Sequence, residues 1–177
     1  GISVSSIKQT EFLLNQLLIA PLTDNEYQIL RGRLVEVLVE AIVFPNFNNG
    51  NCGTDSHVVY KGRIIVYPPD AKGPEVVQTI DIYALDVTRA IFIECKARPQ
   101  RFTEHNIQYL SIINSIMRHY TSVRSFIKGI TLLTPRQLEI LRLQPAYKPW
   151  IESINVMLDV FKKNVGGSPK NREQFGK

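Results

Sequence analysis

The fold is decided by residues 76–97, whose sequence is VVQTIDIYALDVTRAIFIECKA. Two runs rich in β-branched side chains, 76–85 and 90–97, flank a short polar turn, which is the pattern of an antiparallel β-hairpin. Isoleucines surround the few polar positions and favour a hairpin that is buried in a sheet: Ile80, Ile82, Ile91 and Ile93.

The register of this hairpin brings charged residues together. If Leu85 pairs with Ala90 across the turn, Asp81 lies directly opposite Glu94. Because side chains alternate along a strand, Lys96 shares the face of Glu94. Three charged groups are therefore expected to converge at the open end of the hairpin.

Two opposed carboxylates destabilise an ordinary sheet by up to ~1 kcal/mol. A divalent cation between Asp81 and Glu94 would reverse the sign of that interaction, since Mg²⁺ prefers carboxylate oxygens and keeps several waters. One such water can become a nucleophile, and Lys96 could orient it. Cys95 alternates onto the opposite face and is expected to be a small buried core residue.

A simpler interpretation is that these charges have no chemical role. Glu94 and Lys96 could form the solvated polar face of an edge strand, with Asp81 an exposed strand residue. The isoleucines around them argue against it, because charges are rare in a buried sheet without partners.

The chain before the hairpin is expected to begin with helices. Hydrophobic spacing and capping residues predict two of them, followed by a loop, a strand or hairpin and a second loop. The helices are expected over 4–20 and from Thr23 or Asp24 to about 43. The first loop covers 45–56, the strand or hairpin 57–67 and the second loop 68–74.

The chain after the hairpin alternates helix and strand. Thr103 can cap a long helix to about Ser125, residues 129–133 form a strong strand, and Thr134-Pro135 opens a short helix. Residues 150–161 fit either a helix or a strand. This order predicts an α/β layer fold with a mixed sheet.

Asp81 is followed thirteen residues later by Glu94-Cys95-Lys96 in a hairpin. With this pattern the chain resembles the PD-(D/E)XK nuclease superfamily, over roughly residues 26–135. The resemblance implies a restriction endonuclease-like three-layer core, a central mixed sheet flanked by helices, here with an additional N-terminal helix. We expect a helical extension over 1–22, the nuclease-like domain over 23–161 and a disordered basic tail over 162–177. The residue before Asp81 is isoleucine, where many members have proline.

The resemblance also implies roles for individual residues. Asp81 and Glu94, with the Cys95 backbone carbonyl, would bind Mg²⁺ or Mn²⁺, and Lys96 would position the attacking water. In many members a further glutamate, in a Gly-x-x-x-Glu pattern, binds the metal or orients its water. Here Gly32 to Glu36 matches that pattern, with Glu40 as the alternative.

The resemblance implies hydrolysis of phosphodiester bonds in nucleic acid, with a DNA endonuclease as the expected activity. Arg98 and Arg101 follow the site and are candidates for phosphate contacts, although they could equally form a solvated face. Gln108 could replace a glutamine that some members carry on the following helix. The alternatives are a catalytically inactive nuclease-fold module that binds nucleic acid or a protein partner, and an unrelated α/β protein.

Composition and charge set broader limits. The chain has 177 residues, 44% of them hydrophobic, which suits one globular domain. It has two cysteines, too few for a disulfide framework, and no apolar run of about 18 residues, so we expect an intracellular protein without a membrane partner. Residues 1–94 carry 7 basic and 11 acidic side chains, and residues 95–148 carry 9 and 2. The basic second half is consistent with a nucleic-acid partner and equally with an ordinary solvated surface. A homodimer, and further domains if the chain is a fragment, stay open.

Overall fold

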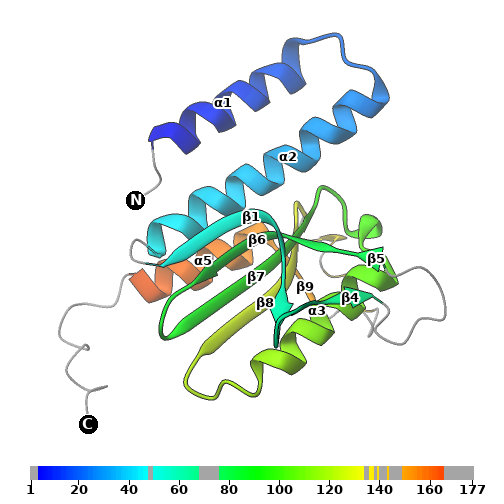
Figure 1. Ribbon diagram of the computed structural model, residues 1–177. Helices are drawn as coiled ribbons and strands as arrows, with labels where there is room; N and C mark the ends of the chain where they lie inside the picture. Colours follow the sequence, from blue (N-terminus) through cyan, green and yellow to red (C-terminus); the bar gives the residue numbers. More distant parts are fainter. Residues whose placement is uncertain are drawn as a thin grey trace.

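The computed structural model describes residues 4–47, 50–67, 76–133, 136–137, 139, 143 and 149–165. In this part of the chain five strands form one mixed sheet with helices on both faces (Figure 1). In order across the sheet, the strands are β1 (Asn51–His57), β6 (Thr79–Leu85), β7 (Arg89–Lys96), β8 (Arg124–Thr131) and β9 (Ile151–Ser153). Neighbours pair antiparallel from β1 to β7 and parallel from β7 to β9. The predicted α/β class with a central mixed sheet flanked by helices is confirmed.

The β6–β7 hairpin has the predicted register. Leu85 pairs with Ala90, and the ladder continues to the pair of Ile82 with Ile93. Every second residue of β6 is buried, whereas β7 is buried at six consecutive positions because it is the middle strand. The open end of the hairpin therefore lies inside the sheet.

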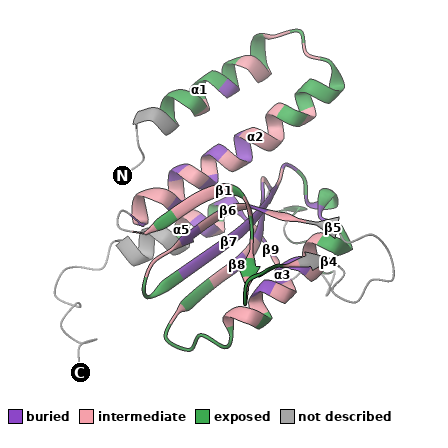
Figure 2. Ribbon diagram, in the orientation of Figure 1, coloured by how far each residue is buried: buried purple, intermediate pink, exposed green. Residues whose placement is uncertain are grey.

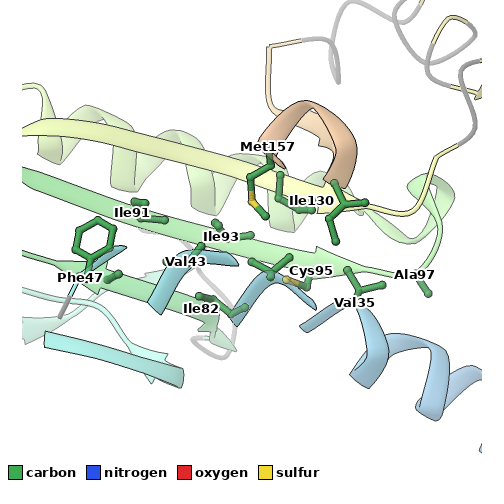
Figure 3. Packing of buried hydrophobic residues seen from close by; sticks show 13 residues of the cluster. Val35, Val43, Phe47, Ile82, Ile91, Ile93, Cys95, Ala97, Ile130 and Met157 are labelled. Carbon is green, nitrogen blue, oxygen red and sulfur yellow. The ribbon is translucent and has the colours of Figure 1, made fainter. Parts of the chain in front are cut away.

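The sheet has a hydrophobic core on each face. One face packs against α2 (Asp24–Val43) and α5 (Ile154–Val165), as Figure 3 shows. Cys95 lies in this cluster, which confirms its prediction as a buried core residue. The other face packs against α3 (Glu104–Met117), with Phe92 and Tyr109 among the buried residues. Glu94 follows Phe92 by two positions and so shares the α3 face.

The first two helices form a helical hairpin beside the sheet (Figure 1). α1 (Val4–Ile19) packs on α2 through Leu13, and Thr23 begins α2 with a capping box completed by Glu26. Both helices agree with the sequence prediction. Large apolar side chains of α1 remain in solvent, and Figure 2 shows how much of this hairpin is exposed; Phe12 is 61% and Leu18 is 80% exposed.

Several predicted boundaries are wrong. The loop expected over 45–56 overlaps a short 3-10 helix, η1 (Phe44–Asn46), and contains all of β1 except its last residue. Asn and Gly disfavour strands locally, but the apolar strand β6 provides a partner. At Gly53 an added Cβ would lie 2.6 Å from the Tyr83 ring, so the glycine permits this close pairing.

The second wrong boundary is the end of the Thr103-capped helix. α3 stops at Met117, about two turns before Ser125, because β8 begins at Arg124 and pairs in parallel with Arg89. Between β7 and α3 lies a second 3-10 helix, η2 (Pro99–Arg101).

The remaining elements are short. Four two-residue strands form two small antiparallel pairs: β2 (Val59–Tyr60) with β3 (Arg63–Ile64), and β4 (Val66–Tyr67) with β5 (Val76–Val77). The ambiguous stretch 150–161 contains both structures, β9 and then α5. α5 reaches Val165 and so includes the first residues of the segment 162–177.

Three further expectations fall on residues that are not described. The loop over 68–74, the helix opened by Thr134-Pro135 and the rest of the tail after Val165 lie outside the described residues. None of the helices in the described part of the chain combines the length and apolar character needed to cross a membrane.

Candidate active site

The candidate site begins where β6 and β7 diverge. The backbone pairing of β6 with β7 ends at Ile82 and Ile93. At the next position the Asp81 side chain replaces the backbone partner, and its Oδ2 accepts a hydrogen bond from the backbone N–H of Cys95 at 2.6 Å. A continued ladder would place Cys95 opposite Ile80. Asp81 therefore closes an opening in the sheet with its carboxylate.

Lys96 joins the two carboxylates. Its Nζ lies 2.5 Å from Glu94 Oε1 and 3.5 Å from Asp81 Oδ2. Glu94 is only 3% exposed, and β7 is the middle strand, so the interpretation of a solvated edge strand is wrong. The three residues singled out from the sequence are thus in direct contact.

Asn106, which sequence analysis missed, also binds Glu94. Its Nδ2 donates to Glu94 Oε1 at 2.9 Å. Its Oδ1 accepts both the backbone N–H and the hydroxyl of Thr103, at 3.0 and 2.9 Å, in the capping box of α3. The amide oxygen is thereby committed to the helix cap, and the amide nitrogen is left for the carboxylate. The Thr-x-x-Asn spacing just after β7 was the available signal.

A second missed residue, Gln78, lies on the same side of the site. Burial raises the pKa of Glu94, and the Gln78 side chain opposes that rise together with Lys96. The Tyr109 hydroxyl, from α3, donates to the backbone carbonyl of Gln78 at 3.0 Å and fixes this segment. Gln78 breaks the predicted strand 76–85 into β5 and β6, which the sequence did not indicate.

The site is walled by apolar groups. Gly129 is the partner of Glu94 on β8, and an added Cβ there would lie 2.5 Å from the Phe102 ring. Phe102, itself 2% exposed, therefore covers the strand next to Glu94. Glu94 Oε2 and the hydroxyl of Thr131, the partner of Lys96, are buried without a hydrogen-bond partner. Water is thus largely excluded from the carboxylate.

This burial changes the protonation of the three groups. Burial, and then repulsion from Asp81, raise the pKa of Glu94 to about 7, against the attraction of Lys96. Burial also raises the pKa of Asp81, opposed by Lys96 and by the Cys95 N–H. Burial alone would lower the pKa of Lys96, but the two carboxylates outweigh it and raise that pKa. The group can therefore exchange a proton near neutral pH or bind a cation.

The acids of α2 form a separate group around their own cation. Arg33 Nη1 lies 2.8 Å from Glu36 Oε2 and 3.2 Å from Glu40 Oε1. Among the described residues, no hydrogen bond or ion pair joins Glu36 or Glu40 to Asp81, and α2 covers the opposite face of the sheet from Glu94. Burial raises the pKa of Glu40. The structure does not bring the predicted fourth acid into contact with the site.

Asp55 connects the two groups electrostatically and was not predicted. It lies in β1 between the partners of Ile82 and Ile80, and its φ of 45° is in the left-handed region. Its charge helps to raise the pKa of both Asp81 and Glu40. A one-residue kink in an edge strand has no clear sequence signal outside Gly and Asn.

The described residues have only part of a metal site. No three His, Cys, Asp or Glu side chains in the described ranges converge closely enough to hold a metal ion. Two carboxylates and a backbone carbonyl nevertheless suit Mg²⁺, which is often bound by one or two carboxylates and several waters. The unpartnered Oε2 of Glu94 is a free ligand atom for such an ion.

The three residues predicted to contact nucleic acid differ in whether their side chains are exposed or bound within the protein. Arg98 lines a cavity of about 640 Å³ with Arg31 and Gln100, beyond the carboxyl ends of β7 and β8, and Arg101 is exposed on η2. Gln108 instead donates from Nε2 to Glu104 Oε1 at 2.8 Å along α3. Arg98 and Arg101 are therefore exposed just after the strand that carries Glu94 and Lys96, whereas Gln108 is bound within its helix.

Comparisons of this chain with protein-family models, with curated proteins and with solved structures give no match, so the site's own geometry has to carry the functional argument.

Proposed function

We propose that this chain is a metal-dependent nuclease of the PD-(D/E)XK type, which hydrolyses phosphodiester bonds in nucleic acid, with DNA as the expected substrate. One observation carries the proposal. Asp81 and Glu94 are buried together around Lys96 at the open end of the central hairpin, and Glu94 Oε2 has no partner. A buried charge cluster of this kind, with more acids than cations, is more typical of a functional site than of a stabilising ion pair.

The residues present fit a magnesium or manganese ion. Asp81, Glu94 and the Cys95 carbonyl would hold it, and Glu36 or Glu40 would act only through intervening water, because neither touches the carboxylates. Such an ion supplies a water that ionises at neutral pH and a positive charge beside the phosphate. Lys96 would orient that water and neutralise charge that develops on the phosphate oxygens. Asn106 holds the Glu94 carboxylate in place.

The surroundings support a polyanionic substrate. Arg98 and Arg31 line one cavity at the edge of the sheet where Lys96 ends β7, and Arg101 is exposed nearby. Phosphate contacts of this kind fix the position of a nucleic acid without reading its sequence. The backbone would then pass along the carboxyl ends of the parallel strands.

The test is a cleavage assay on supercoiled plasmid and on single-stranded DNA with Mg²⁺, Mn²⁺ or EDTA. We expect metal-dependent cutting that falls at least ~100-fold in Asp81→Asn and in Lys96→Ala. Asp86→Asn, at the turn of the same hairpin, is the matched control and should keep wild-type activity. Lys96→Ala should lower turnover more than DNA binding. Equal cutting by wild type and Asp81→Asn would refute the proposal.

A second candidate is the inactive nuclease-fold module that binds nucleic acid or a protein. It is favoured by Lys96, because the ammonium group already neutralises the carboxylates without any metal. Calorimetric titration separates the two candidates. Mg²⁺ or Mn²⁺ binding that is lost in Glu94→Gln supports the nuclease, whereas DNA binding without metal binding supports the module.

A further inference from the structure

We propose that the β2–β3 hairpin, Val59 to Ile64, is an arm that contacts duplex nucleic acid beside the active site. The inference rests on the proposed function for the class of ligand. It adds a contact element that neither the family resemblance nor the basic second half of the chain indicates. Four features of the hairpin carry it: its separation from the sheet, its turn, its charge and its attachment.

The hairpin stands apart from the central sheet. β2 and β3 pair only with each other in the described part of the chain, through Val59 with Ile64 and Tyr60 with Arg63. Three of its four strand residues are exposed, with Val59 at 60% and Ile64 at 46%. Its side chains are therefore available to a partner.

The turn has a defined geometry. Lys61 and Gly62 form the two-residue connection, with φ values of 50° and 75°. Positive φ at both positions is the type I′ geometry, whose twist matches that of paired strands. A non-glycine residue in this conformation is uncommon, and here it places the Lys61 ammonium at the tip, over the Tyr60 ring at 5.2 Å.

The charge of the hairpin is positive and not neutralised. Residues 57–69 contain Lys61 and Arg63 and no acidic residue. Among the described residues neither cation forms an ion pair, in contrast to Arg33, Arg89 and Lys96. Two exposed, unpaired cations on a two-stranded ribbon are complementary to a phosphate backbone.

The base of the hairpin is attached to the active site. His57, just before it, pairs with Thr79, two residues from Asp81. The Ile65 N–H donates to the Val58 carbonyl at 2.8 Å and closes the base, and both side chains pack against the α3-side core. The tip is thus tied to the strand that carries Asp81.

These connections fix the reach of the arm. The four steps from His57 to Lys61 span at most ~14 Å, the step across the strand pair from His57 to Thr79 adds about 5 Å, and Thr79 to Asp81 adds about 7 Å. The tip therefore lies within about 26 Å of Asp81, less than the ~34 Å of one turn of B-DNA. A two-stranded ribbon also fits the major groove. The arm can contact the same duplex turn that the site cuts.

The test measures binding without cleavage. A fluorescent 20-base-pair duplex and the matching single strand are titrated in EDTA with the full chain and with the double variant Lys61→Ala/Arg63→Ala. We expect about tenfold weaker duplex binding at 0.1 M salt, a salt slope shallower by about 2, and a smaller loss for the single strand. Thermal melts should coincide, because the hairpin lies outside the sheet.

The control is Lys8→Ala/Arg118→Ala, which removes the same charge from exposed positions on α1 and at the far end of α3. A hairpin variant that binds the duplex no more weakly than this control would overturn the arm. If that variant also keeps metal-dependent cutting, the arm fails and the nuclease stands. A wild-type chain that neither binds nor cuts nucleic acid would overturn both.

Discussion

The two ends of the β6–β7 hairpin carry the same kinds of residue in opposite electrostatic states. At the turn, Asp86 accepts hydrogen bonds from the Thr88 N–H and hydroxyl and from the Arg89 N–H and Nε, at 2.7 to 2.9 Å. Partial desolvation opposes them, but they lower the pKa of Asp86 to about 2. At the open end, burial raises the pKa of Glu94 to about 7.

Only one of these two ends stabilises the fold. Asp86 is a single carboxylate with several donors and its own cation, close to water. Asp81 and Glu94 are two carboxylates with one cation, inside the sheet. The turn end therefore favours the folded state, and the open end opposes it. A folded chain retains such a penalty where the charges do something else, as they do at active sites.

The largest change in stability is expected when the cation at each end is removed. Lys96→Met leaves two buried carboxylates without a counterion, so we expect the free energy of unfolding at pH 8 to fall by about 3–5 kcal/mol. Arg89→Met, at the exposed turn, should lose about 1 kcal/mol or less. Urea denaturation measures both. Equal losses at the two ends would contradict the comparison.

The next test uses pH. Because the pKa of Glu94 is about 7 in the folded chain against 4.5 for an ordinary glutamate, the folded state holds a proton that the unfolded state has lost between those values. Stability should fall as pH rises through this window, by up to ~3 kcal/mol, and Asp81 acts in the same direction. Glu94→Gln should flatten the slope in chemical denaturation from pH 4.5 to 7. A wild-type stability that rises over this range would be the opposite result.

The turn end should show a smaller effect with the opposite sign. Asp86→Ala removes several exposed hydrogen bonds, and we expect a loss of about 1–2 kcal/mol at pH 7. Since the pKa of Asp86 is lowered to about 2, its contribution is present above pH 4 and disappears as pH falls toward that value. Melting temperatures of wild type and variant should converge in acid. A gap that persists at pH 2 would show that something other than the charge is lost.

The smallest change in stability is expected for variants of Asn106, which affect the open end alone. Asn106→Asp keeps an oxygen for the α3 cap but replaces the amide donor 2.9 Å from Glu94 with a second acceptor. We expect a loss of about 1 kcal/mol at pH 8 and almost none at pH 5, where Glu94 is protonated. Asn106→Ala, which loses the cap oxygen, should be destabilised at both values. The pair separates capping from contact with the carboxylate.

Much of the open end could be predicted because it depends on local pairing. One register, Leu85 with Ala90, was enough to bring Asp81, Glu94 and Lys96 together. The two helix starts at Thr23 and Thr103 followed from capping residues in the same way.

What could not be predicted depends on contacts between distant segments. β1 has a loop-like composition and is a strand only because β6 pairs with it. Asn106 has an ordinary capping position until the fold places Glu94 against it. The separate grouping of Glu36 and Glu40 has another cause. Arg33, three residues before Glu36, offers a nearer partner than any site across the sheet.

The shared amide of Asn106 also limits how this sequence can evolve. The two capping boxes differ at one position: α2 has Glu26, the residue usually favoured there, and α3 has Asn106. A glutamate at 106 would improve the cap but would bring a third carboxylate toward Asp81 and Glu94. Selection for helix stability and selection for the site therefore act on the same side chain, through the oxygen and the nitrogen of its amide. Relatives that keep the acidic pair should avoid glutamate at this position, and relatives that lose Glu94 should be free to acquire it.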